Sequence, residues 1–424
     1  MNEIIFFGLN NYPKLIKNKP NKITKPIQFK FENENENENE KQIKQISSGF
    51  FSTIFLFKNG KAIEYSNQND SNQNPSKIQI EENIQKVSVG DQNEAILTIE
   101  GNVFAKGIYI NPKNPNQFIN ISSLIEDKND RIIQDIVSGY NSVYLLTSNH
   151  NAYGIGSNQF GQLGFDSETL NKTEKPVLMM KNVSKIFSGN NSFYVFLLNS
   201  NQELFGCGDN RWGQLGLGES RKEEIAIKKL IKIQNIPKDK IIDIQCGFKH
   251  SIILIENENQ NENENTKRKL YSCGYWRYNG LGKDGNTYEF TEIESSLFEN
   301  NDDILDFSVG ETDTLILTSN SKLIGFGNNR YDISNYHISC GYDKSFLYYS
   351  PFLSPFSNLE EDLIKLFERK EFCDISFKTK NGEIIEAHKL ILKYRLNQNQ
   401  NQIEKLQKKL FQINQLKNQI KYLK

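Results

Sequence analysis

The side chains that could do acid–base, nucleophilic or metal chemistry are few and scattered in this chain. The four histidines, His150, His250, His337 and His388, stand in unrelated sequence contexts. No Gly-x-Ser-x-Gly turn, phosphate-binding loop or His/Asp metal cluster accompanies them. We therefore predict no catalytic residue, no metal site and no cofactor, and we expect that the protein is not an enzyme.

The five cysteines show no metal or redox pattern either. Cys207, Cys246, Cys273 and Cys340 occupy repeated positions where Ser or Val also occurs, and their spacings match no zinc motif. We interpret them as small core residues. Unpaired cysteines suit a reducing compartment, so we expect the protein in the cytoplasm or nucleus. The sequence shows no apolar run of 18 residues and no signal-peptide pattern, so we expect no membrane insertion.

A small residue followed by glycine recurs seven times at intervals near 50 residues, each time ahead of an apolar run. This period is typical of repeat architectures, which present surfaces rather than catalytic clefts. Glycine adopts positive φ and lets two backbones approach closely, so these positions are predicted to be structural. The seven glycines are Gly49, Gly90, Gly139, Gly189, Gly247, Gly310 and Gly341.

A second motif carries an aromatic residue four positions after a glycine and occurs five times. Two copies continue as Gly-Gln-Leu-Gly, at 161–164 and 213–216. We predict that the aromatic and the leucine pack between neighbouring sheets. Runs such as 192–198 and 251–255 are apolar and of strand length, which predicts buried strands. The five aromatics are Tyr12, Phe160, Trp212, Tyr278 and Tyr331.

These motifs resemble those of the regulator of chromosome condensation (RCC) repeat family, the chromatin-bound Ran exchange factor and its relatives. The resemblance covers roughly residues 1–350 and implies a seven-bladed β-propeller. The signature at 339–341 lacks a second half, and the motif at Gly8 lacks a first half. We predict that these two pieces complete one blade, which removes exposed sheet edges. A histidine that the family often has three residues after the glycine survives only at His250.

Residues 351–358, with Pro351, Pro355 and three serines, are predicted to be a linker. Residues 359–395 resemble the start of a BTB/POZ domain, with a helix at 359–368, strands at 374–378 and 383–387, and a helix from His388. We interpret His388 as a capping or core residue, because no nucleophile or carboxylate stands beside it. The matching residues are Asp374, Ile375, Phe377, Ala387, His388, Lys389, Leu392 and Arg395.

Residues 396–424 have apolar residues at spacings of three and four, which predicts a basic amphipathic helix. It is a divergent BTB remainder, a coiled-coil strand or the end of a truncated gene model. The expected fold is therefore an all-β seven-bladed β-propeller, followed by a small α+β BTB-like segment and a C-terminal amphipathic helix.

The net charge of −1 is unevenly distributed, because residues 389–424 hold nine Lys/Arg and one Glu. A basic tail attracts acidic partners, but aromatics for base stacking are sparse there. We interpret it as a solvated helix face and expect no nucleic-acid partner. The polar tracts at 32–40, 67–74, 256–265 and 397–402 cannot bury enough apolar surface to order themselves, and the first three are predicted to be loops between strands of a blade.

Two functions fit these observations. The first is a non-enzymatic scaffold or adaptor, in which the propeller binds a client protein. Its BTB-like module would form a homodimer or dock a cullin ubiquitin ligase. The alternative, implied by the founding family member, is a guanine-nucleotide exchange factor for a small GTPase. No protruding insertion with defined sequence supports exchange, and a propeller fold alone does not imply it.

Overall fold

The computed structural model describes residues 3–9, 22–29, 42–66, 76–165, 171–237, 239–257, 267–275, 285–293, 303–310, 313–319, 323–327, 337–341, 344–349, 375–378 and 384–387. The chain divides into two compact units, residues 1–350 and 351–424. Several predictions lie outside the described residues: Tyr12, Tyr278 and Tyr331, the linker at 351–358, Asp374, and everything from His388 onward.

The described part of the first unit consists of seven antiparallel sheets, which we number as blades 1 to 7 in chain order. Blades 1 to 5 have four strands each, and blade 6 has three in its described part. The strands of blades 1 to 3 are β3 (Ile43–Ser48), β4 (Ser52–Phe57), β5 (Ala62–Ser66), β6 (Ser76–Lys77), β7 (Ile84–Val89), β8 (Asn93–Thr98), β9 (Val103–Gly107), β10 (Ile119–Asn120), β11 (Ile133–Ser138), β12 (Ser142–Thr147), β13 (Ala152–Ser157) and β14 (Lys172–Met180). Those of blades 4 to 6 are β15 (Val183–Phe187), β16 (Tyr194–Asn199), β17 (Leu204–Asp209), β18 (Ala226–Lys232), β19 (Lys240–Cys246), β20 (His250–Asn257), β21 (Lys267–Gly274), β22 (Thr287–Glu292), β23 (Ile304–Val309), β24 (Asp313–Thr318) and β25 (Leu323–Gly327).

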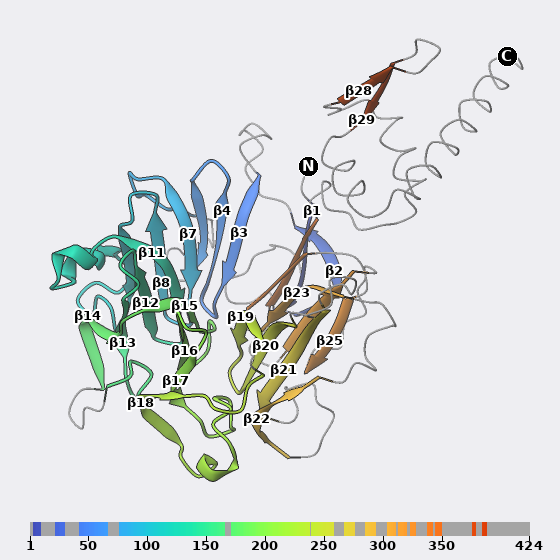
Figure 1. Ribbon diagram of the computed structural model, residues 1–424. Coiled ribbons are helices and arrows are strands. Elements are labelled where there is room, and N and C mark those ends of the chain that lie inside the picture. The colour runs from blue at the N-terminus through green and yellow to red at the C-terminus, as the bar shows by residue number, and fades with distance from the viewer. Residues whose placement is uncertain are drawn as a thin grey trace, which may run out of the picture. The chain divides into compact units, whose positions relative to one another are not determined.

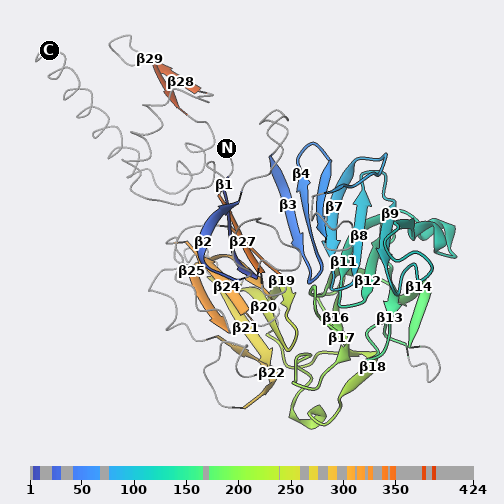
Figure 2. The same cartoon turned by 180° about the vertical axis from the view of Figure 1, so that it is seen from behind.

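Blade 7 is built from both ends of the propeller sequence. Its strand order is β2 (Lys22–Phe29), β1 (Glu3–Leu9), β27 (Lys344–Tyr349) and β26 (His337–Gly341). Strand β1 pairs antiparallel with β27 along its length, with Ile4 opposite Tyr348. The paired strands can be followed in both views, and β27 is labelled in the second (Figures 1 and 2). This confirms the prediction that the two incomplete motifs form one blade. The closure pairs what would otherwise be open strand edges.

The blades follow one another around a central axis, as both views of the propeller show (Figures 1 and 2). The first strand of each blade lies against the first strand of the next, and β26 contacts β3 to close the ring. The second strands are the most completely buried; every residue of β4, β8, β12 and β16 is buried. Their β-branched and aromatic side chains fill the space between blades. The predicted all-β propeller is confirmed.

Helical structure in the described residues is limited to three short 3-10 turns, η2 (Ser122–Leu124), η3 (Lys128–Asp130) and η4 (Glu219–Arg221). None of the helices in this part of the chain is long and apolar enough to cross a membrane.

The polar tracts differ in part from the prediction. Strand β20 continues through Glu256 and Asn257, so the tract at 256–265 begins within a strand, because these residues pair with Arg268 and Lys267 of β21. The tract at 32–40 falls between β2 and β3, and thus joins blade 7 to blade 1 rather than two strands of one blade.

In the second unit, the structure describes one antiparallel strand pair. Strand β28 (Ile375–Lys378) pairs with β29 (Ile384–Ala387), with Ile375 opposite Ala387 and Phe377 opposite Ile385. These strands occur where the sequence predicts them, and they place Ile375, Phe377 and Ala387 of the BTB-like motif on paired strands.

Candidate functional site

The signature glycines follow or end the innermost strand of each blade, and the described ones serve close backbone approach. A Cβ atom on Gly49 would overlap the carbonyl oxygen of Gly90, and one on Gly90 would overlap that of Gly139. A Cβ atom on Gly189 would overlap the carbonyl oxygen of Cys246 in the next blade, and one on Gly247 would overlap the His250 ring and crowd the Gly310 carbonyl oxygen. None of Gly49, Gly90, Gly139, Gly189 and Gly247 has positive φ. Glycine is expected at such positions for positive φ or for close backbone approach. These five positions require close approach alone. Gly310 follows β23, and Gly341 is the last residue of β26.

In three of the repeats the residue three positions after the glycine binds the next blade. Asn93 Nδ2 donates to the Gly139 carbonyl at 3.1 Å, and Ser192 Oγ donates to the Gly247 carbonyl at 2.8 Å. His250 Nε2 lies 3.1 Å from Thr314 Oγ1. Complete burial lowers the pKa of His250 to about 3. His250 is therefore a neutral inter-blade residue rather than an accessible base.

The second motif has two kinds of position. Leu163 and Leu215 are fully buried, which confirms that the leucine packs in the core. Phe160 and Trp212 are half-buried, and each contacts a ring of the next blade, Phe193 and Tyr275 respectively. The aromatic thus packs against the neighbouring blade, as predicted, but at the loop end of the sheets rather than in the core. The chain turns at the positive-φ glycine that follows each aromatic, Gly161 and Gly213, which leaves the ring at the loop surface.

Cys207, Cys246 and Cys273 are buried free thiols, as expected of core residues. Burial raises the pKa of the Cys207 thiol far above its ordinary value, which disfavours the reactive thiolate. In the portion of the chain that the structure describes, no three His, Cys, Asp or Glu side chains are placed to hold a metal ion.

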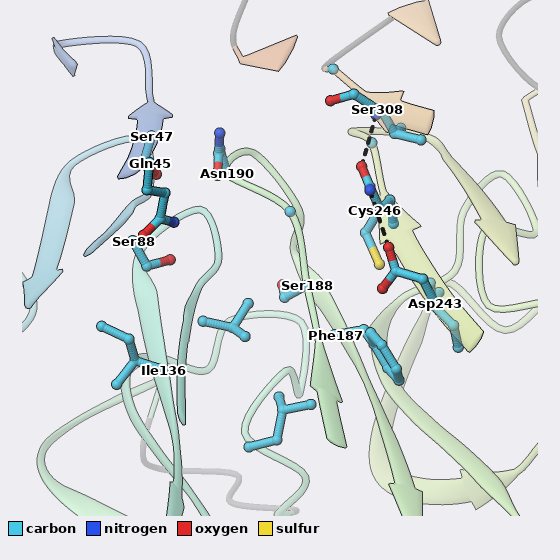
Figure 3. A pocket seen from close by; sticks show the side chains of 18 of the residues that line it. Gln45, Ser47, Ser88, Ile136, Phe187, Ser188, Asn190, Asp243, Cys246 and Ser308 are labelled. Carbon is cyan, nitrogen blue, oxygen red and sulfur yellow. Dashed lines mark hydrogen bonds between the residues drawn. The ribbon is translucent and has the colours of Figure 1, made fainter. Parts of the chain in front are cut away.

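The central channel contains a cavity of about 540 Å³. Its wall is formed by residues four and two positions before the signature glycines. Asn190 extends into the channel between opposite walls (Figure 3), and its Nδ2 donates to the Ser48 carbonyl of blade 1. The lining residues at these positions are Gln45, Lys86, Asp135, Lys185, Asp243 and Asp306, and Ser47, Ser88, Val137, Phe187, Gln245 and Ser308.

Two glutamines of the cavity bind the backbone of the next blade. Gln45 Nε2 donates to the Val87 carbonyl at 2.8 Å, and its Oε1 accepts from the Val87 amide at 3.1 Å. Gln245, two positions before its glycine rather than four, donates to the Phe307 carbonyl at 2.8 Å and accepts from the Val309 amide at 3.0 Å. Each side chain thus substitutes for a strand partner and joins two blades.

The charged residues of the cavity also have partners within its wall. Lys86 pairs with Asp135 at 2.5 Å, and Lys185 Nζ donates to the Ile242 carbonyl at 2.9 Å. Burial raises the pKa of Asp243, and the nearby Lys185 partly opposes the effect. These interactions hold neighbouring blades together, which gives the charged residues of the cavity a structural role.

A cluster of charged side chains is buried between blades 1 and 2 and consists of Glu64, Glu94 and Lys106. Lys106 Nζ lies 2.8 Å from Glu64 Oε2 and 3.2 Å from Glu94 Oε2, and all three residues are buried. Desolvation raises the pKa of Glu94, while Lys106 lowers it and Glu64 raises it further. The cluster is closed to solvent, which excludes it as a substrate site and makes it a structural element.

Six aromatic rings and two cations from blades 3, 4 and 5 form a contiguous surface, which we call the aromatic patch. All of its members lie in connections after the first or third strand of a blade, or near the start of a second strand. In an up-and-down sheet the connections after the first and third strands lie at the same end, so the members of the patch share one end of the propeller. All six rings are half-buried. The patch consists of Tyr140, Phe160, Phe193, Arg211, Trp212, Phe248, Lys249 and Tyr275.

Phe193 is central to the patch. Its ring stacks on Tyr140 at a centroid distance of 4.0 Å, and it contacts Phe160 at 5.0 Å and Phe248 at 5.9 Å. Aromatic side chains of this kind, at the rim of a rigid scaffold, are enriched at protein–protein interfaces and in their hot spots.

The two cations of the patch are held differently. Arg211 lies 4.7 Å from the centroid of Phe160 and forms a bidentate ion pair with Asp209 at 2.9 and 2.8 Å. Lys249 lies 4.6 Å from the centroid of Trp212. Among the described residues, Lys249 forms no ion pair with a carboxylate. Arginine and aromatic rings together again favour a protein partner.

Comparison with known proteins agrees with the repeat and the fold. A model of the regulator of chromosome condensation (RCC1) repeat matches residues 201–254, which run from blade 4 into blade 5. An RCC1 domain-containing protein of Dictyostelium discoideum is 29% identical over 239 residues, covering 48% of this chain and 44% of its own. An RCC1 repeat-containing protein of Schizosaccharomyces pombe is 26% identical over 180 residues, covering 42% and 48%. The chain carries an RCC1 repeat and has RCC1-repeat proteins as homologues, and it spans less than half the length of these relatives.

Solved structures show the same propeller. Prp20p from Saccharomyces cerevisiae superposes with a TM-score of 0.69 at 17% identity, covering 88% of this chain and 95% of that one. Human WBSCR16 gives a TM-score of 0.66 at 15% identity, covering 82% and 98%. At these identities the likeness establishes the fold alone.

Sequence reasoning missed most of the aromatic patch. The sequence contained a signal, because Tyr140 and Phe248 directly follow the signature glycines Gly139 and Gly247. A repeat that ends two of its inner strands with an aromatic places both rings at the same end of the propeller. The buried Glu64–Glu94–Lys106 cluster had no comparable signal.

Proposed function

We propose that this protein is a non-enzymatic interaction scaffold whose propeller binds a client protein through the aromatic patch. The main observation that supports this function is that six half-buried aromatic rings from three blades form one continuous surface. Apolar rings at a surface release water on binding, and rigid rings lose little conformational entropy when they are covered. RCC1-like propellers bind proteins, which supports this class of function.

The finer proposal is that of an adaptor. The propeller would hold the client, and the BTB-like module, of which β28 and β29 are described, would self-associate or dock a cullin ubiquitin ligase. This part depends on the sequence resemblance at 359–395 rather than on the geometry of the patch.

A photo-crosslinking amino acid at position 160, within the patch, tests where the client binds. The same probe at Ile99, 60% exposed in the β8–β9 turn at the opposite end of the blades, is the matched control. We expect one protein to crosslink from position 160 and not from position 99. Trp212→Ala should then weaken binding of that purified protein by roughly tenfold or more, as truncation of a hot-spot residue does.

Two results would count against this function. Crosslinking that is equal from both positions would show that the patch is not the binding surface. Stimulated release of GDP from a purified small GTPase would instead move the assignment to the alternative, a guanine-nucleotide exchange factor.

A further inference from the structure

One part of the aromatic patch surrounds a cation on several sides. Lys249 Nζ lies 4.6 Å from the ring centroid of Trp212, 5.2 Å from that of Phe248 and 5.3 Å from that of Tyr275. The walls come from two blades, since Trp212 follows β17 of blade 4 and Tyr275 follows β21 of blade 5. The Trp212 and Tyr275 rings meet edge to face at 4.8 Å. We call these three rings the aromatic cage.

The faces of aromatic rings attract cations, and several rings around one point suit a quaternary ammonium group. A primary ammonium such as that of Lys249 is compact and strongly hydrated, so it gives up water to lie among rings. A trimethylammonium group carries the same charge but buries apolar methyl groups against the same rings. The cage therefore suits a methylated ammonium better than the lysine that occupies it.

We propose that the aromatic cage binds a trimethylated lysine side chain of a protein partner, and that Lys249 occupies the site as an internal competitor. This inference rests on the proposed function, because it specifies the chemistry of the client that the aromatic patch binds. A partner lysine would enter as the Lys249 side chain swings into solvent.

The contacts of Lys249 permit that exchange. Its side chain has no carboxylate partner in the described part of the chain, so no ion pair is lost when it leaves. Its backbone is fixed, because the Tyr275 amide donates to the Lys249 carbonyl at 2.8 Å. Removing the side chain should therefore leave the walls of the cage in place.

Arg211 provides the matched contrast within the same patch. It also lies over one ring, that of Phe160, but Asp209 holds it by two hydrogen bonds of 2.9 and 2.8 Å. Among the residues that the structure describes, one ring faces Arg211, whereas three face Lys249. Arg211 is thus a fixed part of the patch, and Lys249 is the group that a ligand can replace.

The test uses full-length protein with Trp276→Phe, which leaves Trp212 as the sole tryptophan of the two in the chain. Tetramethylammonium and a short peptide containing trimethyllysine are titrated while Trp212 fluorescence is followed. An internal competitor that fills the cage nine-tenths of the time weakens apparent affinity about tenfold. We therefore expect Lys249→Ala to bind both probes about tenfold more tightly than the parent. Lys58→Ala, which removes an exposed lysine from the β4–β5 turn at the opposite end of the blades, should bind them as the parent does.

Three controls make the result decisive. The same peptide with unmodified lysine should bind Lys249→Ala more weakly than the trimethylated peptide. Isothermal titration replaces fluorescence for Tyr275→Ala, which should lose binding. Phosphocholine is a quaternary ammonium from a different source and should not outcompete the trimethyllysine peptide.

Absence of trimethyllysine binding in folded Lys249→Ala, equal affinity for the unmodified peptide, or a preference for phosphocholine would overturn the inference. Its failure is separable from failure of the proposed function. If the client that crosslinks at position 160 binds the Trp212→Ala variant more weakly than the wild type, the patch binds protein even though the cage does not bind a methylated lysine.

Discussion

The propeller solves the problem of joining blades in two chemically opposite ways, between blades 1 and 2 and between blades 5 and 6. The first junction buries charge: Lys106 lies between the carboxylates of Glu64 and Glu94. The second buries a neutral imidazole: His250 contacts Thr314 at 3.1 Å, and the Gln245 amide binds the β23 backbone. The same steric frame of close-packed signature glycines thus accommodates either chemistry between two blades.

The two junctions should respond oppositely to pH. A carboxyl with a raised folded pKa holds its proton more tightly in the folded state, so its contribution to stability is lost as pH rises. A histidine with a lowered folded pKa contributes stability that is lost as pH falls. Because a buried charge without its partner is the costliest state, the charged junction should also be the more fragile to mutation.

The largest effect is expected from breaking the charged junction. Lys106→Met leaves two buried carboxylates facing each other, which we expect to lower the free energy of unfolding by about 3–5 kcal/mol. Urea denaturation at pH 7.5 measures this. Lys86→Met is the matched control, because its ion pair with Asp135 joins blades 2 and 3 but both side chains are 35% exposed. We expect that control to cost about 1 kcal/mol or less, and equal losses in the two variants would contradict the contrast.

A smaller effect should be shared by both junctions, since it tests the steric frame and not the charge. A Cβ atom at Gly247 would overlap the His250 ring and lie 2.8 Å from the Gly310 carbonyl oxygen. One at Gly49 would overlap the Gly90 carbonyl. We expect Gly247→Val and Gly49→Val each to lower the free energy of unfolding by about 1–3 kcal/mol through overpacking. Thermal melting of both variants checks this, and a melting temperature like that of the wild type in either would refute the close-approach role.

The sequence predicts the steric frame well and the chemistry of the junctions poorly. The glycines and the Leu163 and Leu215 positions repeat at a fixed period, so their roles follow from one another, and the closure of blade 7 follows from counting half-motifs. Lys106 and Glu64 are 42 residues apart and meet only when two blades pack. Nothing in either strand alone marks these charges as buried, because alternation along a strand does not reveal which neighbour will cover it.

Gln245 illustrates the same limit. Its sequence position identifies an inner strand, but its bond to the Phe307 carbonyl depends on the distance between two strands that are far apart in the chain. The aromatic patch is more predictable from the sequence than the charged junction and less predictable than the signature glycines. Its residues are placed by repeat positions, yet their contacts with each other, such as Tyr140 on Phe193, arise only from the spacing of neighbouring blades.

The finest test of the comparison is its pH dependence. Burial is the main cause that raises the pKa of Glu94 from 4.5 to about 7. The nearby Lys106 lowers this pKa, and the nearby Glu64 raises it. The unfolded chain releases this proton near pH 4.5, so the stability that Glu94 contributes is complete below that pH and is lost as pH rises through about 7. For His250, burial lowers the pKa from 6.5 to about 3, so its contribution is present above pH 6.5 and is lost as pH falls toward 3.

Glu94→Gln and His250→Gln remove these two dependences separately. Each intact group contributes a slope of at most about 1.4 kcal/mol per pH unit between its unfolded and folded pKa values. We expect the free energy of unfolding of Glu94→Gln, relative to wild type, to rise between pH 4.5 and 7. That of His250→Gln, relative to wild type, should rise as pH falls below 6.5. Urea titrations at half-unit pH steps measure both differences. If the two differences had the same sign of slope, the junctions would not be electrostatic opposites, and the steric frame alone would account for how the blades are joined.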